Sequence, residues 1–299
     1  MIEVKKVYKT FQNATVLSNI DLQIEKGSIF GLLGSNGAGK TTLLKLIAGL
    51  YKQDRGDILI DKKPVFENED IKQRFIFLTD IPYFFPHYTI KQMANFYENI
   101  YPSFSRERFQ TLQDVFDLDL KQKIYRLSKG VQRQVAFWLA FSAMPELLIL
   151  DEPFDGLDPV MRKKMKNIII QDVAAREMTV IVSSHNLQEV EDISDHIGIL
   201  HKGELLIKRN LDDLKSNIHK VQIAFQGSVP SEMLQQLQIV YQEQRGSVHL
   251  FIVKGNADEF SSYIKSFKPL LFDLLPLTLE EIFIYEMGEK GYAIENILI

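Results

Sequence analysis

The chain has 299 residues, of which 45% are hydrophobic and 25% charged, enough for one large domain or for a domain with a smaller accessory one. Its formal net charge of -4 shows no basic excess of the kind that marks nucleic-acid binding, so no nucleic acid is expected as a partner. The absence of cysteine excludes disulfides and thiolate metal sites, and no signal peptide or membrane-spanning run of about 20 apolar residues is apparent, so the expected location is the cytoplasm.

The first informative stretch combines a strand, a glycine-rich loop and a helix. Ile20, Leu22 and Ile24 alternate with polar residues and predict a half-buried, antiparallel strand. The apolar run 28–33 predicts a buried strand, and residues 42–48 have a helical pattern. The loop between them matches the phosphate-binding pattern G-x-x-x-x-G-K-[ST], called Walker A, in which backbone N–H groups and a helix N-terminus surround anionic oxygens. The predicted nucleotide-binding residues are Ser35, Asn36, Gly37, Ala38, Gly39, Lys40, Thr41 and Thr42.

Within this loop two side chains have distinct predicted roles. Lys40 places a point charge at the terminal phosphates, and the Thr41 hydroxyl is positioned to ligate Mg²⁺. A ligand that carries phosphate groups and Mg²⁺ are therefore expected at this loop.

Four later runs are apolar without alternation, which is typical of strands covered on both faces. They are residues 75–78, 147–150, 179–182 and 197–200. With helices between them, they predict an α/β fold with a largely parallel sheet.

A helical insertion, at about residues 83–130, interrupts this alternation. It is rich in aromatic residues, most of which are expected in the core, while the remainder forms a groove for a partner. These aromatic residues are Phe84, Phe85, Tyr88, Phe96, Tyr97, Tyr101, Phe104, Phe109 and Phe116.

Acidic and polar residues follow the later strands, at the edge of an open α/β sheet where ligands bind. Asp151 can hold Mg²⁺, directly or through water, and Glu152 can orient and polarise an attacking water. His185 follows the strand 179–182. Ser128 and Gly130 stand at the start of an apolar helix, either as a second anion site or as an ordinary helix cap.

After Gly203 no further phosphate chemistry appears. Alternation predicts strands at 221–225 and 248–252, with a helix over Ser231–Gln244 between them and another over residues 260–267. Thr278 and Glu281 form a capping-box pair that opens a last helix. We expect an accessory α/β domain at residues 217–299, after a nucleotide-binding domain at residues 1–216.

The order of these motifs resembles the nucleotide-binding subunits of ABC transporters, over roughly residues 1–208. The resemblance implies a P-loop NTPase fold with a RecA-like core, an antiparallel β-subdomain and a helical subdomain. It also implies that Phe11 stacks on adenine, that Glu152 is the general base, and that His185 is the switch histidine. Residues 127–130 match the signature sequence, in which Ser128 and Gly130 read the γ-phosphate of ATP held by the partner subunit. Residues 155–158 match the loop that crosses the dimer interface.

Three positions depart from the family pattern. The signature reads LSKGV, with Lys129 and Val131 where glycine and glutamine are usual, as in the single-domain ATPases of bacterial ABC-2-type transporters, many of them exporters. Asp80 stands where the family has the glutamine of the Q-loop. We expect Asp80 to contribute to the metal site, with its negative charge offset by Mg²⁺ or Lys40.

The resemblance implies an ATP-hydrolysing subunit that dimerises head to tail, as a homodimer or with a second ATP-binding subunit. It would drive transport, by implication export, through a separate transmembrane permease, and would lie on the inner face of the cell membrane through that partner. The alternatives are a soluble ABC-type ATPase acting on ribosomes or nucleic acid, and a nucleotide-binding regulator without turnover. The single Walker A, the lack of a basic tract and the presence of Glu152 favour the transporter subunit.

Overall fold

The computed structural model describes residues 1–282, and the chain forms two compact units divided between Lys208 and Arg209. This division lies before the expected boundary at 216/217. Helix α8 (Leu211–Asn217) contacts strand β11 and is therefore part of the second unit. None of the helices in residues 1–282 is both long and apolar enough to cross a bilayer.

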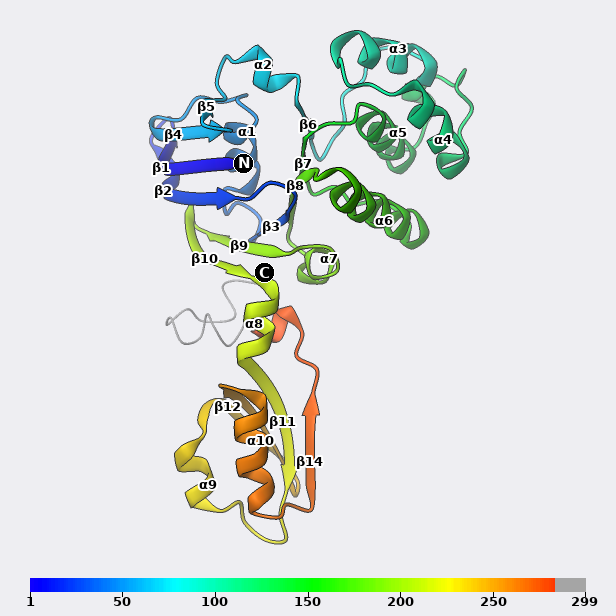
Figure 1. The fold of residues 1–299 in the computed structure, drawn as a ribbon. Coiled ribbons are helices and arrows are strands. Elements are labelled where there is room, and N and C mark those ends of the chain that lie inside the picture. Colours follow the sequence, from blue (N-terminus) through cyan, green and yellow to red (C-terminus); the bar gives the residue numbers. More distant parts are fainter. Residues whose placement is uncertain (283–299) are drawn as a thin grey trace. The chain divides into compact units, whose positions relative to one another are not determined.

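A six-stranded sheet, ordered β10-β9-β3-β8-β7-β6, forms the centre of the first unit (Figure 1). Strand β3 pairs in parallel with β8 and β9, and β7 pairs in parallel with β6 and β8, which confirms the predicted parallel sheet. The strands are β3 (Ile29–Leu33), β6 (Phe75–Leu78), β7 (Leu147–Asp151), β8 (Thr179–Ser184), β9 (His196–His201) and β10 (Glu204–Asn210).

Both faces of this sheet are covered, which explains why its strands are apolar without alternation. Leu147 and Ile149 share a core with helix α1 (Lys40–Ile47), whereas Leu148 and Leu150 share another with helices α5 (Lys129–Ser142) and α6 (Pro159–Arg176). The short helix α7 (Leu187–Glu191) follows β8. The ends of β3, β7 and β8 therefore deliver the predicted site residues to one edge of the sheet.

A second, antiparallel sheet is ordered β2-β1-β4-β5 and packs on the other side of α1 (Figure 1). Its strands are β1 (Ile2–Phe11), β2 (Ala14–Ile24), β4 (Arg55–Ile60) and β5 (Lys63–Pro64). The predicted strand at 20–25 is confirmed as the end of β2, which pairs antiparallel with β1. Strand β1 was not predicted, because register shifts around Lys6, whose φ is 47°, interrupt its alternation.

The helical insertion predicted at about residues 83–130 contains α3 (Ile90–Ile100), α4 (Arg106–Phe116) and the 3₁₀ turn η1 (Ile124–Arg126), while the short helix α2 (Glu69–Lys72) precedes it. Thr89 and Gln92 form a complete capping box, and Ser105 caps α4. Phe109 and Phe116 stack on the buried ring of Trp138 in α5, with ring centroids 4.5 and 5.5 Å away.

The division of the insertion's aromatic residues into core and surface is also confirmed. Five more of them pack against the core, namely Phe84, Phe96, Tyr97, Tyr101 and Phe104. Phe85 and Tyr88 are exposed, as are the neighbouring Ile81 and Tyr83.

The second unit has the order βαββαβ in a four-stranded sheet, β12-β13-β11-β14, which is the ferredoxin-like arrangement. Its elements are β11 (Ile218–Ala224), α9 (Ser231–Gln236), β12 (Gln238–Arg245), β13 (Val248–Lys254), α10 (Ala257–Ser266) and β14 (Leu271–Leu275). The predicted strands near 221 and 248 and the helix near 260 are confirmed.

The predicted helix over Ser231–Gln244 is wrong beyond Gln236. Residues 238–245 form strand β12, which pairs antiparallel with β13, and Ile239 packs against the core beside Val253. Pairing with an adjacent strand outweighs the weak helical preference of this glutamine-rich segment. At the end of the described chain, Glu281 N donates to Thr278 Oγ1, as the capping box requires, and residues 279–282 are helical. The rest of that predicted helix lies outside the described residues.

Candidate functional site

The phosphate-binding loop joins β3 to α1, as the sequence predicts. Gly39 precedes the first residue of α1 with a φ of 107°, in the region that favours glycine. A Cβ atom at this position would also lie 2.8 Å from Leu17 Cδ2. The loop can therefore bring its N–H groups to the start of α1 only with glycine at this position.

Most of the predicted nucleotide and metal residues line one cavity of about 370 Å³. Its lining comprises Val16, Ser35, Asn36, Gly37, Gly39, Lys40, Thr41, Thr42, Asp80, Asp151 and Glu152. Ala38, in the same loop, is buried and is not part of this lining. The loop after β3, the loop after β6 and the end of β7 thus meet around one space.

Lys40 is buried, and its ammonium joins the loop to the end of β7. Its Nζ donates to the carbonyl oxygen of Gly34 at 2.6 Å and lies 3.2 Å from Glu152 Oε1. Glu152 has a φ of 46°, a left-handed conformation that is uncommon for a residue with a Cβ. Such outliers concentrate at functional sites, where surrounding contacts hold them.

Ser183, at the end of β8, aligns the two acidic residues. Its Oγ donates to Asp151 Oδ1 at 2.7 Å and accepts from Glu152 N at 3.1 Å. The parallel pairing of Asp151 with Ser183 brings these groups together. No specific role for Ser183 was predicted, because that role depends on the register of two strands distant in sequence.

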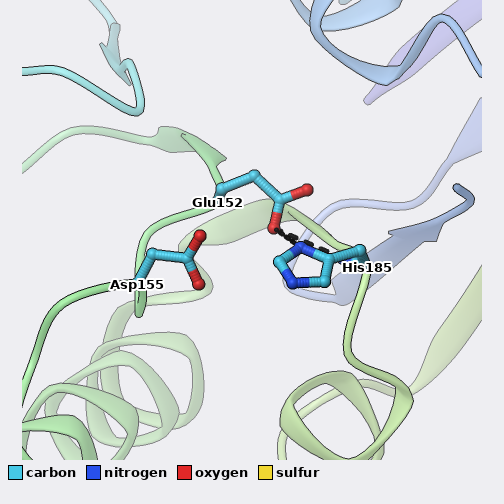
Figure 2. A group of neighbouring side chains, drawn as sticks. All are labelled: Glu152, Asp155 and His185. Atoms are coloured by element: carbon cyan, nitrogen blue, oxygen red, sulfur yellow. Dashed lines mark hydrogen bonds and ion pairs between the residues drawn. The ribbon is translucent and has the colours of Figure 1, made fainter. Parts of the chain in front are cut away.

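His185 contacts the other oxygen of Glu152. Its Nδ1 lies 3.0 Å from Glu152 Oε2, and its backbone N–H donates to the same oxygen at 3.3 Å. Figure 2 shows this contact with Asp155 beside it. Each of the three residues offers one atom that could ligate a metal ion, and these atoms lie within 4.8 Å of one another. Glu152 is therefore held between Lys40 and His185.

The three predicted metal ligands line the cavity and offer the hard oxygen atoms that Mg²⁺ prefers. They are the Thr41 hydroxyl and the carboxylates of Asp80 and Asp151. Asp151 is buried, and its ordering by Ser183 is the kind of outer contact that orients metal ligands. The residues present therefore fit Mg²⁺.

Asp80 has a partner that the sequence did not reveal. Arg133, on α5, donates from Nη2 to Asp80 Oδ1 at 2.8 Å and also to its carbonyl oxygen. The expectation that only Mg²⁺ or Lys40 would offset the charge of Asp80 is wrong, since a guanidinium does so here. An arginine in a helix gives no sequence signal of the distant loop that it contacts.

Besides Ala38 and His185, the predicted residues Phe11, Ser128 and Gly130 lie outside the lining of this cavity. Phe11 is 38% exposed at the end of β1 and makes an edge-on contact with Tyr51. Ser128 is exposed and caps α5, accepting a hydrogen bond from Val131 N at 3.3 Å. A Cβ atom at Gly130 would lie 2.7 Å from the carbonyl oxygen of Gly156, so glycine there permits a close approach to the loop 155–158.

Comparisons with known proteins agree with this arrangement. The family model described as "ABC transporter" matches residues 17–155. The chain is 34% identical over 290 residues to "ABC transporter ATP-binding protein YtrB" of Bacillus subtilis (strain 168), covering 97% of this chain and 99% of that one. It is 31% identical to "Bacitracin transport ATP-binding protein BcrA" of Bacillus licheniformis, covering 83% and 80% of the two chains.

Solved structures show the same fold. An ATP-binding subunit of an ABC transporter superposes with a TM-score of 0.67 at 28% identity, covering 72% of this chain and 92% of that one. A dimeric ATP-binding cassette, MJ0796, bound to ADP and Pi after hydrolysis, superposes with a TM-score of 0.64 at 24% identity, covering 71% and 99%. The chain belongs to the family of ABC transporter ATP-binding proteins and is an ATPase subunit of that family.

Proposed function

We propose that two such subunits close head to tail around two ATP molecules, and that this closure and its reversal drive transport through a separate transmembrane permease. Each ATP lies in the cavity of one subunit and is completed by Ser128 and Gly130 of the second subunit. The observation that supports this proposal is that the predicted ATP-binding residues do not all line the same cavity. Lys40, Asp151 and Glu152 line one cavity, whereas Ser128 is exposed outside it.

The contacts of Lys40 indicate how the site responds to nucleotide. Its ammonium pairs with Glu152 in this structure, and a γ-phosphate in the loop offers it a stronger anionic partner. When the Lys40 ammonium pairs with the phosphate instead, Oε1 of Glu152 loses this partner. That oxygen can then accept a proton from the attacking water. His185 keeps the other oxygen in place at 3.0 Å.

Thr41, Asp151 and Asp80 are the residues that would hold Mg²⁺. Bound there, the ion supplies charge stabilisation for the phosphate oxygens. The remaining contributions come from the chain itself: N–H donors of residues 35–42, the charge of Lys40, and the carboxylate of Glu152.

A groove on the helical side of the first unit supports the proposed permease contact. It has a volume of about 380 Å³, and Tyr83, Phe84, Tyr97 and Tyr101 line it with Leu50 and Phe77. Tyr83 is 78% exposed, and aromatic residues are enriched at protein interfaces. We propose that a permease segment facing the cytoplasm docks here, which would place the chain on the inner membrane face.

The direction proposed is export, on the strength of the signature variant LSKGV and of relatives such as BcrA, whose name assigns it to bacitracin transport. Either a second copy of this chain or a different ATP-binding subunit can supply Ser128 and Gly130. The material transported is determined by the permease.

The deciding experiment is phosphate release by the chain with and without its co-purified permease in vesicles. We expect ATP hydrolysis in both samples and stimulation by the permease. Stimulation by ribosomes or nucleic acid, with no permease co-purifying, would instead support the alternative ATPase. Binding of ATP without any phosphate release would support the regulator without turnover.

A further inference from the structure

Arg133 is a buried cation in the second turn of α5, two residues after the signature sequence LSKGV. Its side chain is 10% exposed, and burial of a guanidinium is costly unless its N–H groups find acceptors. Nη1 donates to the carbonyl oxygens of Glu152, at 3.0 Å, and of Asp155, while Nη2 donates to two oxygens of Asp80. One guanidinium thus joins α5 to the loops that follow β6 and β7.

Among these acceptors only the Asp80 carboxylate is charged. Its Oδ1 lies 2.8 Å from Arg133 Nη2, while its side chain is 57% exposed and lines the cavity with Thr41 and Asp151. The charged groups that share this cavity are Lys40, Asp151 and Glu152. The Asp80 carboxylate therefore has one cationic partner, the Arg133 guanidinium, and also lines the cavity in which Mg²⁺ is proposed to bind.

We propose that Arg133 is a positioning residue that competes with Mg²⁺ for the carboxylate of Asp80. This inference rests on the proposed function, in which Asp80 contributes to the metal site. Arg133 either holds the carboxylate away from the metal or shares it, and sharing brings two cations close together. Both arrangements weaken metal binding, and by linkage metal binding weakens the contact between Arg133 and Asp80.

The consequence reaches the start of α5. Ser128 begins this helix, and the proposed function places Ser128 against the ATP of the second subunit. Because Arg133 is on the same helix, metal loading at one cavity loosens the tie between α5 and the loop after β6. The contact between Arg133 and Asp80 thus couples metal binding in one subunit to the position of Ser128, which faces the ATP of the other subunit.

A double-mutant cycle tests the competition without hydrolysis. Mn²⁺ serves as the probe, its free concentration being read by electron paramagnetic resonance in the presence of a non-hydrolysable ATP analogue. Arg133→Gln should tighten Mn²⁺ binding by roughly threefold to tenfold, which lies within the range of coupling between residues in contact. Asp80→Asn should weaken Mn²⁺ binding, and Arg133→Gln should then have no effect in the Asp80→Asn background.

Two further variants separate competition from loss of packing. Arg133→Lys retains a positive charge but loses the planar fork of donors, so its Mn²⁺ affinity should lie between those of the parent and of Arg133→Gln. Arg108→Gln removes another arginine–aspartate pair, with Asp172, away from the cavity, and should leave Mn²⁺ affinity unchanged. Thermal unfolding of each variant verifies that the fold is retained.

The competition is overturned if Arg133→Gln weakens Mn²⁺ binding or leaves it unchanged, or if its effect is equal in both backgrounds. It is also overturned if Asp80→Asn binds Mn²⁺ as tightly as the parent. Failure of the proposed function is seen in a different measurement, phosphate release with and without the permease, which the Mn²⁺ titration does not use.

Discussion

Lys40 has an anionic partner in this structure, the carboxylate of Glu152 at 3.2 Å. A buried lysine with this contact and two backbone acceptors is already oriented toward the loop that surrounds the phosphates. Its ordering lowers the entropic cost of binding an anion at this position.

Lys40→Ala should abolish tight ATP binding, because it removes a charge-assisted contact to the terminal phosphates. Calorimetric titration with ATP measures this directly, and Lys45→Ala, on the same helix but outside the cavity lining, is the control. An unchanged ATP affinity in Lys40→Ala would contradict the assignment of this loop as the nucleotide-binding site.

Glu152→Gln should keep ATP binding and lose hydrolysis. The amide no longer competes as an anion for Lys40, and it cannot accept the proton of water, a loss that typically costs about 10²–10⁴ in rate. Phosphate release measures the rate, and size-exclusion chromatography with ATP should show a trapped dimer. A variant that hydrolyses ATP at the parent rate would assign the base to another residue, with His185 or Asp80 next in line.

At the scale of elements, an aromatic stack links α5 to helix α4 of the helical insertion. Trp138 is fully buried between Phe109 and Phe116, and its Nε1 donates to the carbonyl oxygen of Phe109 at 2.9 Å. The same helix carries Ser128 at its start and Arg133 in its second turn. Stability of this stack therefore affects residues of the site.

Trp138→Ala should destabilise the chain by about 3–5 kcal/mol, the range for truncating a buried aromatic residue. Trp138→Phe should cost less, because it retains most of the stacking and loses the hydrogen bond. Urea unfolding measures both, with Tyr125→Ala, at a residue 50% exposed, as the control. Equal stability of Trp138→Ala and Tyr125→Ala would contradict this role.

A charged contact joins the beginnings of β6 and β7. Arg74 donates to Glu146 from Nε at 3.0 Å and from Nη2 at 2.6 Å, and also pairs with Asp61. These hydrogen bonds from Arg74 lower the pKa of Glu146 below its ordinary value of 4.5. A carboxylate with a lowered pKa stabilises the fold above the pKa of the unfolded chain, and this contribution is lost as the pH falls through the lower, folded value.

Glu146→Gln should therefore be less stable than the parent at neutral pH by about 1 kcal/mol or less, since both side chains are partly exposed. The difference should shrink as the pH falls below 4.5, the ordinary value for this carboxyl group. Urea unfolding at several pH values measures it, and Arg74→Gln should show the same trend. A difference that grows on acidification would contradict the assignment.

At the scale of the whole molecule, the two units differ in kind. The first carries the nucleotide cavity and the aromatic groove, and the second has a ferredoxin-like arrangement without a phosphate-binding loop among residues 209–282. The proposed permease contact belongs to the first unit.

Tyr83→Ser should uncouple ATP hydrolysis from transport while leaving hydrolysis by the isolated chain close to that of the parent. The exposed ring lines the groove but not the nucleotide cavity. Phosphate release with and without the permease measures coupling, and Tyr241→Ser is the matched control in the second unit. Loss of coupling in Tyr241→Ser alone, or crosslinks to the permease only from residues 221–299, would move the dock to the second unit.

The sequence alone determined the features that depend on neighbouring residues. The spacing of Gly34, Gly39 and Lys40 predicted the loop between a strand and a helix, and the continuous apolar runs predicted strands covered on both faces. The order of motifs also predicted the family that the comparisons show. These signals are local, so they can be read without knowing the packing.

Contacts between distant segments were decided only by the tertiary structure. Strand β12 formed where a helix was predicted, because the edge of β13 offered a pairing that no local pattern encodes. The alignment of Asp151 and Glu152 by Ser183 depends on the register of β7 and β8. The pairing of Asp80 with Arg133 joins residues far apart in the chain, and only the position of α5 against the sheet brings that charge to Asp80.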